Sequence, residues 1–142
     1  MFRTLTDTIF VAPQIDVDAV AAAHAAGVKL IINNRPEDES PDQTPGAEIE
    51  AAARAAGLDY VAIPVGHAGF SQPQVDAMAA ALGDAQGKIL AYCRSGTRST
   101  LLWALAQASE GAQPEALAES AAAAGYDLSP IRAMLDMLSS RG

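Results

Sequence analysis

Apolar runs and alanine-rich stretches alternate along this chain, separated by glycine, proline and polar clusters. Short apolar runs bounded in this way are typical of buried strands, and apolar residues three or four apart are typical of helices. The expected strands cover residues 9–12, 28–33, 58–63 and 88–92. The expected helices follow Asp16, lie between Pro45 and Gly57, follow Ser71, and cover residues 99–108, 114–124 and 129–138. This order predicts an α/β domain with a central, mostly parallel sheet of four to five strands flanked by helices.

Local signals support these boundaries. Asp16 is a suitable N-cap for the first helix, and Ser71 followed by Gln74 has the pattern of a capping box. Pro64 ends the third strand, and no linker or internal repeat interrupts the 142 residues. The sequence therefore predicts a single domain over residues 1–142.

Composition narrows the class of protein. Half of the residues are hydrophobic and the net charge is −8, which is typical of a globular chain. The acidic balance argues against nucleic acid as a partner, because an extended basic surface is missing. No apolar run has the length of a membrane span, and the N-terminus lacks the apolar core of a signal peptide. With a single cysteine, and so no internal disulfide, the expected location is the cytoplasm.

The chemistry of the chain is concentrated after the fourth predicted strand. There the sequence reads Cys93-Arg94-Ser95-Gly96-Thr97-Arg98-Ser99, a six-residue loop from Cys93 to Arg98 followed by an apolar helix. A strand–loop–helix directs backbone N–H groups and a helix N-terminus at one point, which makes an anion site and stabilises a thiolate. We therefore interpret Cys93 as a nucleophile, with Arg98 binding an oxyanion. The alternative is a small buried thiol, for which two arginines and several hydrogen-bonding residues are a poor lining.

Other residues of this region have alternative interpretations. Arg98 could instead form an ion pair with an acidic loop, and Arg94 could reach a larger anionic substrate or be solvated. Ser95, Gly96 and Thr97 are expected to line the anion site, with Gly96 permitting a tight backbone turn. Ser99 is expected to cap the following helix.

Outside this loop the candidates are few. Arg35 ends a predicted parallel strand, at the edge where α/β sheets bind ligands, and the alternative is an ion pair with the acids that follow it. Residues 37–42 are interpreted as a solvated acidic loop. His24 is more typical of packing or surface than of a ligand. One cysteine and two distant histidines give no metal-site spacing, so no metal or cofactor is expected.

Two segments carry a resemblance to known proteins: Asn33-Asn34-Arg35-Pro36 and the run from Tyr92 to Ser99. With the order of the elements, they make the chain similar to compact tyrosine and dual-specificity phosphatases. More narrowly, it resembles the bacterial beta-lactamase hydrolase-like or phosphatase-like domain family, also labelled a sulfur transferase family. The resemblance covers nearly the whole chain and implies the phosphatase-like fold. In phosphatases of this kind the hydroxyl after the arginine steadies the thiolate, a role that falls on Ser99.

The sequence departs from the phosphatase pattern at two places. Tyrosine phosphatases generally have one residue more between the cysteine and the arginine, whereas the spelling here is similar to the active loop of rhodanese sulfurtransferases. The smaller ring suits a single sulfur atom on Cys93. Such phosphatases also take a general acid, an aspartate, from the loop after the third strand. Here that loop, residues 64–71, has His67 as its only titratable side chain, which is either that acid or a surface residue.

These departures favour a sulfurtransferase that carries a persulfide on Cys93. Its expected partners are a small anionic donor such as thiosulfate and an external thiol acceptor, because a lone cysteine leaves no internal resolving thiol. The alternative is a cysteine-dependent phosphatase that acts on a phosphate ester through a phosphocysteine. A third hypothesis is an anion-binding module without catalysis. The sequence carries no signature of an oligomeric state.

Overall fold

The computed structural model describes residues 2–141, in which five strands form one sheet in the order β1-β2-β5-β3-β4. The strands are β1 (Arg3–Thr6), β2 (Ile9–Ala12), β3 (Val28–Asn33), β4 (Asp59–Ala62) and β5 (Lys88–Tyr92). Strands β2, β5, β3 and β4 are parallel, and β1 pairs antiparallel with β2 at the edge. The predicted mostly parallel sheet of four to five strands is confirmed.

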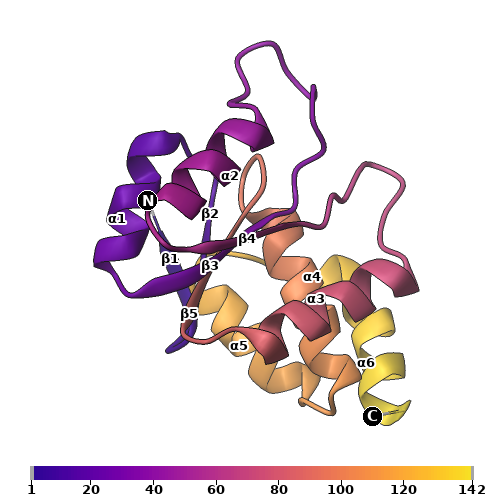
Figure 1. The fold of residues 1–142 in the computed structure, drawn as a ribbon. Coiled ribbons are helices and arrows are strands. Elements are labelled where there is room, and N and C mark those ends of the chain that lie inside the picture. The colour runs from indigo at the N-terminus through magenta and orange to yellow at the C-terminus, as the bar shows by residue number, and fades with distance from the viewer. Residues whose placement is uncertain (1, 142) are drawn as a thin grey trace.

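In the described residues, six helices cover the two faces of the sheet. They are α1 (Val17–Ala25), α2 (Gly46–Ala55), α3 (Gln72–Asp84), α4 (Thr97–Ser109), α5 (Pro114–Ala123) and α6 (Arg132–Arg141), with a 3₁₀ turn at Ser129–Ile131. Helices α1 and α2 lie on one face, and α3 to α6 lie on the other (Figure 1). Because alternate residues of β2, β3 and β5 point to opposite faces, each strand contributes to both cores.

Helix α4 is the central helix of the thicker layer. Its residues from Ser99 to Ala106 are all buried, because the sheet lies on one side and α3 and α6 lie on the other. Trp103 and Leu105 belong to the same apolar cluster as Leu135 of α6. A helix that is apolar on every side is expected in such a position.

The carboxyl ends of the parallel strands meet at one edge of the sheet. There the residues after β2 and β3 are joined to the end of β5 and the loop that follows it by backbone hydrogen bonds, from Gln14 N to Arg94 O (3.2 Å) and from Asn34 N to Tyr92 O (2.8 Å). This edge brings the segments that follow three strands together, as expected for a ligand site in a parallel sheet.

Two expectations about elements need correction. First, strand β1 has to be added to the expected strands. It was not predicted because only Leu5 of its four residues is buried, so no hydrophobic run marks it. Second, α4 begins at Thr97 and not at Ser99, because Gly96 takes the N-cap position with a φ of 91°. Cys93 is thus separated from the helix by only three residues.

The α1 and α3 starts follow the predicted chemistry. Asp16 caps α1, its Oδ1 accepting from Ala19 N at 3.0 Å, and Gln74 Oε1 accepts from Ser71 N at 2.8 Å ahead of α3. Within the described part of the chain, no helix has both the length and the apolar character needed to cross a membrane.

Candidate active site

Cys93 lies at the carboxyl end of β5, the middle strand of the sheet, and its side chain is completely buried. The backbone N–H of Gly96 donates to Cys93 Sγ at 3.1 Å. We call residues 93–98 the Cys93 loop. Its turn depends on the positive φ of Gly96, a conformation that costs other L-residues free energy.

Backbone donors of the Cys93 loop remain available. Among residues 2–141, no backbone or side-chain oxygen accepts from the N–H groups of Arg94, Ser95 or Arg98. Unpaired N–H groups at the start of a helix attract negative charge. The Cys93 loop therefore has unpaired backbone donors besides the N–H that binds the thiol, which is what the predicted anion site would need.

Arg98 is held by two acceptors from other loops. Its Nη1 donates to Glu39 Oε2 at 2.6 Å and to Val65 O at 2.6 Å, and its Nη2 donates to Glu39 Oε1 at 2.8 Å. The hydrogen bond to Glu39 raises the pKa of Arg98, and interaction with Cys93 raises it further. Arg98 thus forms the ion pair with the acidic loop that was its alternative interpretation, and it also interacts with Cys93; the binding of an oxyanion stays a prediction.

The remaining donors of Arg98 point away from Glu39. A guanidinium has five N–H groups in a fixed plane. Glu39 occupies the end formed by Nη1 and Nη2, and Val65 takes the other hydrogen of Nη1. The side edge, formed by Nε and the second hydrogen of Nη2, donates to no oxygen of the described residues, so it can bind an oxyanion with two parallel hydrogen bonds.

Glu39 links the two arginines of the site. Besides Arg98, it accepts from Arg35 Nε at 2.9 Å, and its side chain is only 13% exposed. The hydrogen bond from Arg98 lowers the pKa of Glu39 to about 2 against the opposing effect of burial, and Arg35 contributes to the lowering. The prediction that residues 37–42 are simply solvated is therefore wrong for Glu39. The pairing with Arg35, four positions earlier, was one of the sequence interpretations, whereas the pairing with Arg98 has no local pattern because that partner is 59 positions away.

Arg35 is buried, and each of its three side-chain nitrogens donates to a protein group. It donates to Glu39, to Gln14 Oε1 (3.0 Å) and to Ser40 Oγ (3.0 Å). The structure therefore gives the ion pair that was the alternative to substrate binding. Arg35 fixes the loop that carries Glu39.

The other predicted residues differ in exposure. His67 is 93% exposed, with Nε2 4.0 Å from Glu39 Oε2, so it lies at the rim of the site. Arg94 is exposed and makes no ion pair within the described residues. The Ser95 and Thr97 side chains are exposed and hydrogen-bonded to each other at 2.9 Å, and Thr97 belongs to α4.

Ser99 does not cap α4, so that prediction is wrong. Gly96 holds the N-cap position, which places Ser99 inside the first turn with its hydroxyl buried and without a partner among the described residues. A buried hydroxyl without an acceptor is costly. A bound anion or the thiolate of Cys93 would be suitable partners.

Comparison with known proteins fits this geometry. Residues 1–112 match the family described as "Beta-lactamase hydrolase-like protein, phosphatase-like domain". The chain belongs to this family. A beta-lactamase hydrolase-like protein of Agrobacterium fabrum is 33% identical over 107 residues, which are 75% of this chain and 25% of that protein. The chain thus spans about a quarter of that relative's length.

Solved structures show the same fold. A Neisseria meningitidis protein, provisionally assigned as a phosphatase, has a TM-score of 0.84 at 31% identity over 96% of each chain. A mutant form of Tk-PTP has a TM-score of 0.74 at 13% identity, covering 99% of this chain and 95% of that chain, and at this identity it bears on the fold alone. The phosphatase-like fold implied by the resemblance is confirmed. The descriptions of these relatives give no support to sulfur transfer.

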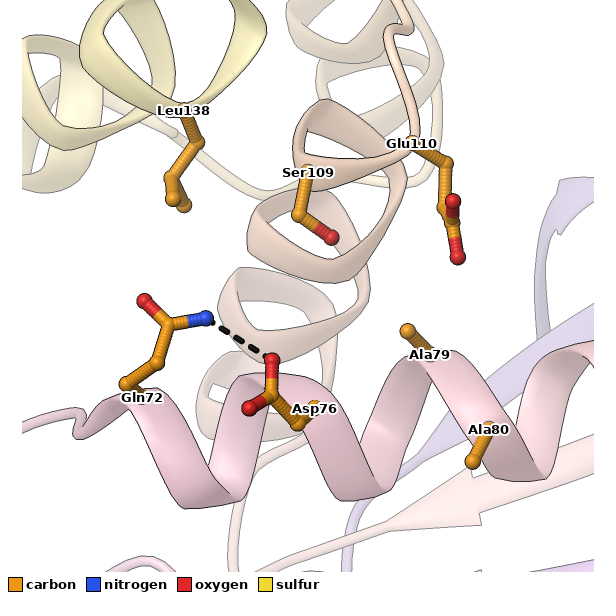
Figure 2. Close-up of a pocket in the computed structure, with 7 residues that line it drawn as sticks. All are labelled: Gln72, Asp76, Ala79, Ala80, Ser109, Glu110 and Leu138. Atoms are coloured by element: carbon orange, nitrogen blue, oxygen red, sulfur yellow. Dashed lines mark hydrogen bonds between the residues drawn. The ribbon is translucent and has the colours of Figure 1, made fainter. Parts of the chain in front are cut away.

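A pocket also lies away from the Cys93 loop. It encloses about 500 Å³ between α3, the end of α4 and α6, and its lining includes Asp76, Glu110 and Leu138 (Figure 2). Asp76 accepts from Gln72 Nε2 at 2.8 Å along α3. None of the predicted site residues lines this pocket, and its two carboxylates make it unsuitable for an anion. Among residues 2–141, no three metal-ligating side chains come together.

Proposed function

We propose that this member of the family hydrolyses phosphate monoesters with Cys93 as nucleophile. The observation that carries the proposal is the buried thiol that accepts from Gly96 N–H, on a loop whose other N–H groups are largely unpaired and whose Arg98 interacts with it. The similarity along nearly the whole chain to a protein provisionally assigned as a phosphatase supports it.

The first step is nucleophilic attack by the thiolate. Cys93 Sγ forms a bond to phosphorus as the ester P–O bond breaks, and the leaving oxygen departs with the electron pair and takes up a proton. The N–H groups of the Cys93 loop and the side edge of Arg98 bind the other phosphate oxygens, where negative charge is concentrated in the transition state. In the second step water attacks phosphorus, the P–S bond breaks, and phosphate leaves with the thiolate restored.

The proton for the leaving oxygen does not come from Glu39. Because the pKa of Glu39 is lowered to about 2, its carboxyl is ionised at neutral pH. His67 lies at the rim next to Glu39 and is the titratable side chain that we assign to this step. An aryl phosphate hardly needs the proton, whereas an alkyl phosphate does, so His67→Asn should slow the alkyl ester far more than the aryl ester.

A second candidate function is sulfur transfer, which the short Cys93 loop favours. Only three residues separate Cys93 from α4, so the ring is small. Cys93 would attack the outer sulfur of thiosulfate, breaking the S–S bond and releasing sulfite with the electron pair. The resulting persulfide would then pass its outer sulfur to an external thiolate.

One pair of measurements tests both functions. Phosphate release from an aryl phosphate is followed by absorbance, and intact-protein mass is measured after incubation with thiosulfate. Turnover that disappears in Cys93→Ser and falls strongly in Arg98→Ala supports the phosphatase, and the exposed Arg94 provides Arg94→Ala as a matched control that should retain most activity. A gain of one sulfur, removed by cyanide and absent in Cys93→Ser, would instead establish the persulfide carrier. Neither signal, with tight phosphate binding, would overturn both and leave an anion-binding module.

A further inference from the structure

Tyr126 touches the Cys93 loop from a segment outside the 1–112 family match. It follows α5 and is half-buried, and its Oη donates to the carbonyl oxygen of Ser95 at 3.1 Å. None of the residues discussed above as a site residue lies in this part of the chain. The contact joins the C-terminal helices to the backbone that surrounds the thiol.

The hydrogen bond acts on the peptide unit that faces the thiol. The C=O of Ser95 and the N–H of Gly96 belong to one planar peptide group, which is trans, so they point in opposite directions. The N–H is the one that donates to Cys93 Sγ at 3.1 Å. By holding the carbonyl outward, Tyr126 holds the N–H inward.

Close packing at Gly96 shows that the loop and the phenol fit each other. A Cβ on Gly96 would lie 2.2 Å from Tyr126 Oη and 3.0 Å from the ring carbon that carries it. The phenol therefore occupies the space that any larger residue at this position would need. Rotation of the Ser95–Gly96 peptide is opposed both by the hydrogen bond and by this contact.

The ring of Tyr126, whose hydroxyl faces the Cys93 loop, contacts Arg3 of strand β1. The guanidinium of Arg3 lies over the ring, 5.2 Å from its centroid, and Arg3 Nη1 donates to Ala124 O at 3.0 Å. A cation over an aromatic face is attracted to it. Gly125 allows this approach, because a Cβ there would lie 2.6 Å from Arg3 Nη1. Arg3, Tyr126 and the Cys93 loop thus form a continuous chain of contacts.

We infer that Tyr126 is a positioning residue that sets the orientation of the Ser95–Gly96 peptide and so the hydrogen bond to the Cys93 thiolate. The inference rests on the proposed role of Cys93 as nucleophile. The hydrogen bond of Tyr126 in this region goes to the Ser95 carbonyl and not to the thiol. It acts through the backbone of the Cys93 loop, and Arg3 acts through Tyr126.

The test is Tyr126→Phe, which keeps the ring and removes the donor. The measurement is the rate of iodoacetamide alkylation of Cys93 as a function of pH, followed by intact-protein mass. We expect the pH of half-maximal alkylation to rise by roughly half a unit, about a threefold loss of thiolate stabilisation. For the aryl phosphate, kcat should fall about two- to tenfold with little change in KM. Arg3→Met should shift the alkylation profile in the same direction by less.

Tyr60→Phe is the matched control. It also removes one hydroxyl, which accepts from Asn33 Nδ2 on the other face of the sheet, and it should leave the alkylation profile unchanged. A profile for folded Tyr126→Phe equal to that of the wild type, or an equal shift in Tyr60→Phe, would overturn the inference. Since alkylation needs no turnover, absence of phosphate release would count against the proposed function and not against this one.

Discussion

Glu39 makes the candidate site a network of charges and not a single arginine beside a thiol. Its carboxylate binds the end of Arg98 and also Arg35, while the side edge of Arg98 stays free. An unpaired arginine side chain can adopt many rotamers, and a bidentate contact to its planar guanidinium restricts it to one orientation. For the proposed function, we infer that Glu39 orients Arg98 toward the phosphate group.

Replacing Glu39 by Gln tests this role at the level of one residue. The amide keeps the shape but loses the charge, which leaves two arginines, one of them buried, without their counter-ion. We expect the free energy of unfolding at pH 7 to fall by about 1–3 kcal/mol, and phosphate turnover to fall as well. Urea unfolding measures the first effect and aryl phosphate hydrolysis the second.

The control for this variant is Glu50→Gln. Glu50 pairs with Arg54 at 2.9 Å on α2, but both side chains are well exposed. An exposed pair of this kind contributes about 0–1 kcal/mol, so the control should change the stability little. Equal losses in the two variants would contradict a special role for Glu39.

The wild type and Glu39→Gln should also differ in how their stability depends on pH. The pKa of Glu39 in the folded protein is about 2, below its ordinary value of 4.5. Its stabilising contribution is therefore complete above pH 4.5 and is lost as the pH falls toward 2. The difference in unfolding free energy between the two proteins should shrink between about pH 5 and pH 2.5 in urea titrations. If the difference in unfolding free energy stays constant over this pH range, Arg98 and Arg35 do not lower the pKa of Glu39 in the folded protein.

At the residue scale, the sequence predicts the parts of the site that are local. Cys93 and Arg98 lie on one loop, so their proximity follows from the strand and helix around them. An ion pair of Arg98 with an acidic loop was one of the two interpretations, but Glu39 and Val65 could not be singled out, because they come from two other loops that only the folded sheet brings together. Ser99 was misassigned because glycine also occurs at the N-cap position of helices, and here Gly96 takes that position.

At the element scale, the start of α4 determines the geometry of the Cys93 loop. Gly96 combines a φ of 91° with contact to Tyr126, whereas Gly57 has a φ of 83° and a Cβ added there would meet no atom within 4 Å. A positive φ alone costs an alanine about 1–2 kcal/mol. Comparing the two positions therefore separates backbone strain from steric conflict.

Gly96→Ala should be the more damaging of two otherwise similar changes. We expect Gly57→Ala to lower the free energy of unfolding by about 1 kcal/mol. Gly96→Ala should lower it by about 2–4 kcal/mol and abolish turnover, because the methyl group displaces Tyr126 and turns the peptide. Chemical denaturation and aryl phosphate hydrolysis provide the comparison. Equal losses of unfolding free energy in the two variants would mean that Tyr126 moves aside at no energetic cost.

The elements themselves were largely predictable. Strand β3 is almost entirely buried and mostly apolar, so its position and its parallel surroundings follow from the sequence. Strand β1 was not predicted, because it lies at the edge of the sheet and carries the exposed residues Arg3 and Thr4. Its role emerges only in three dimensions, where Arg3 reaches the C-terminal segment.

At the scale of the whole molecule, the C-terminal helices share one core with the sheet. Leu135 of α6 is fully buried in the cluster that holds Trp103 of α4, whereas Met137 on the same helix is 50% exposed. If the chain is one cooperative unit, Leu135→Ala should lower the free energy of unfolding by about 2–5 kcal/mol and Met137→Ala by less than about 1 kcal/mol.

Two probes test whether the unit is cooperative. Trp103, the only tryptophan, reports on α4, and circular dichroism reports on all helices. The two probes should give coincident urea transitions in every variant, because separate units would unfold at different midpoints. A split transition in Leu135→Ala would place α5 and α6 outside the unit that carries the site.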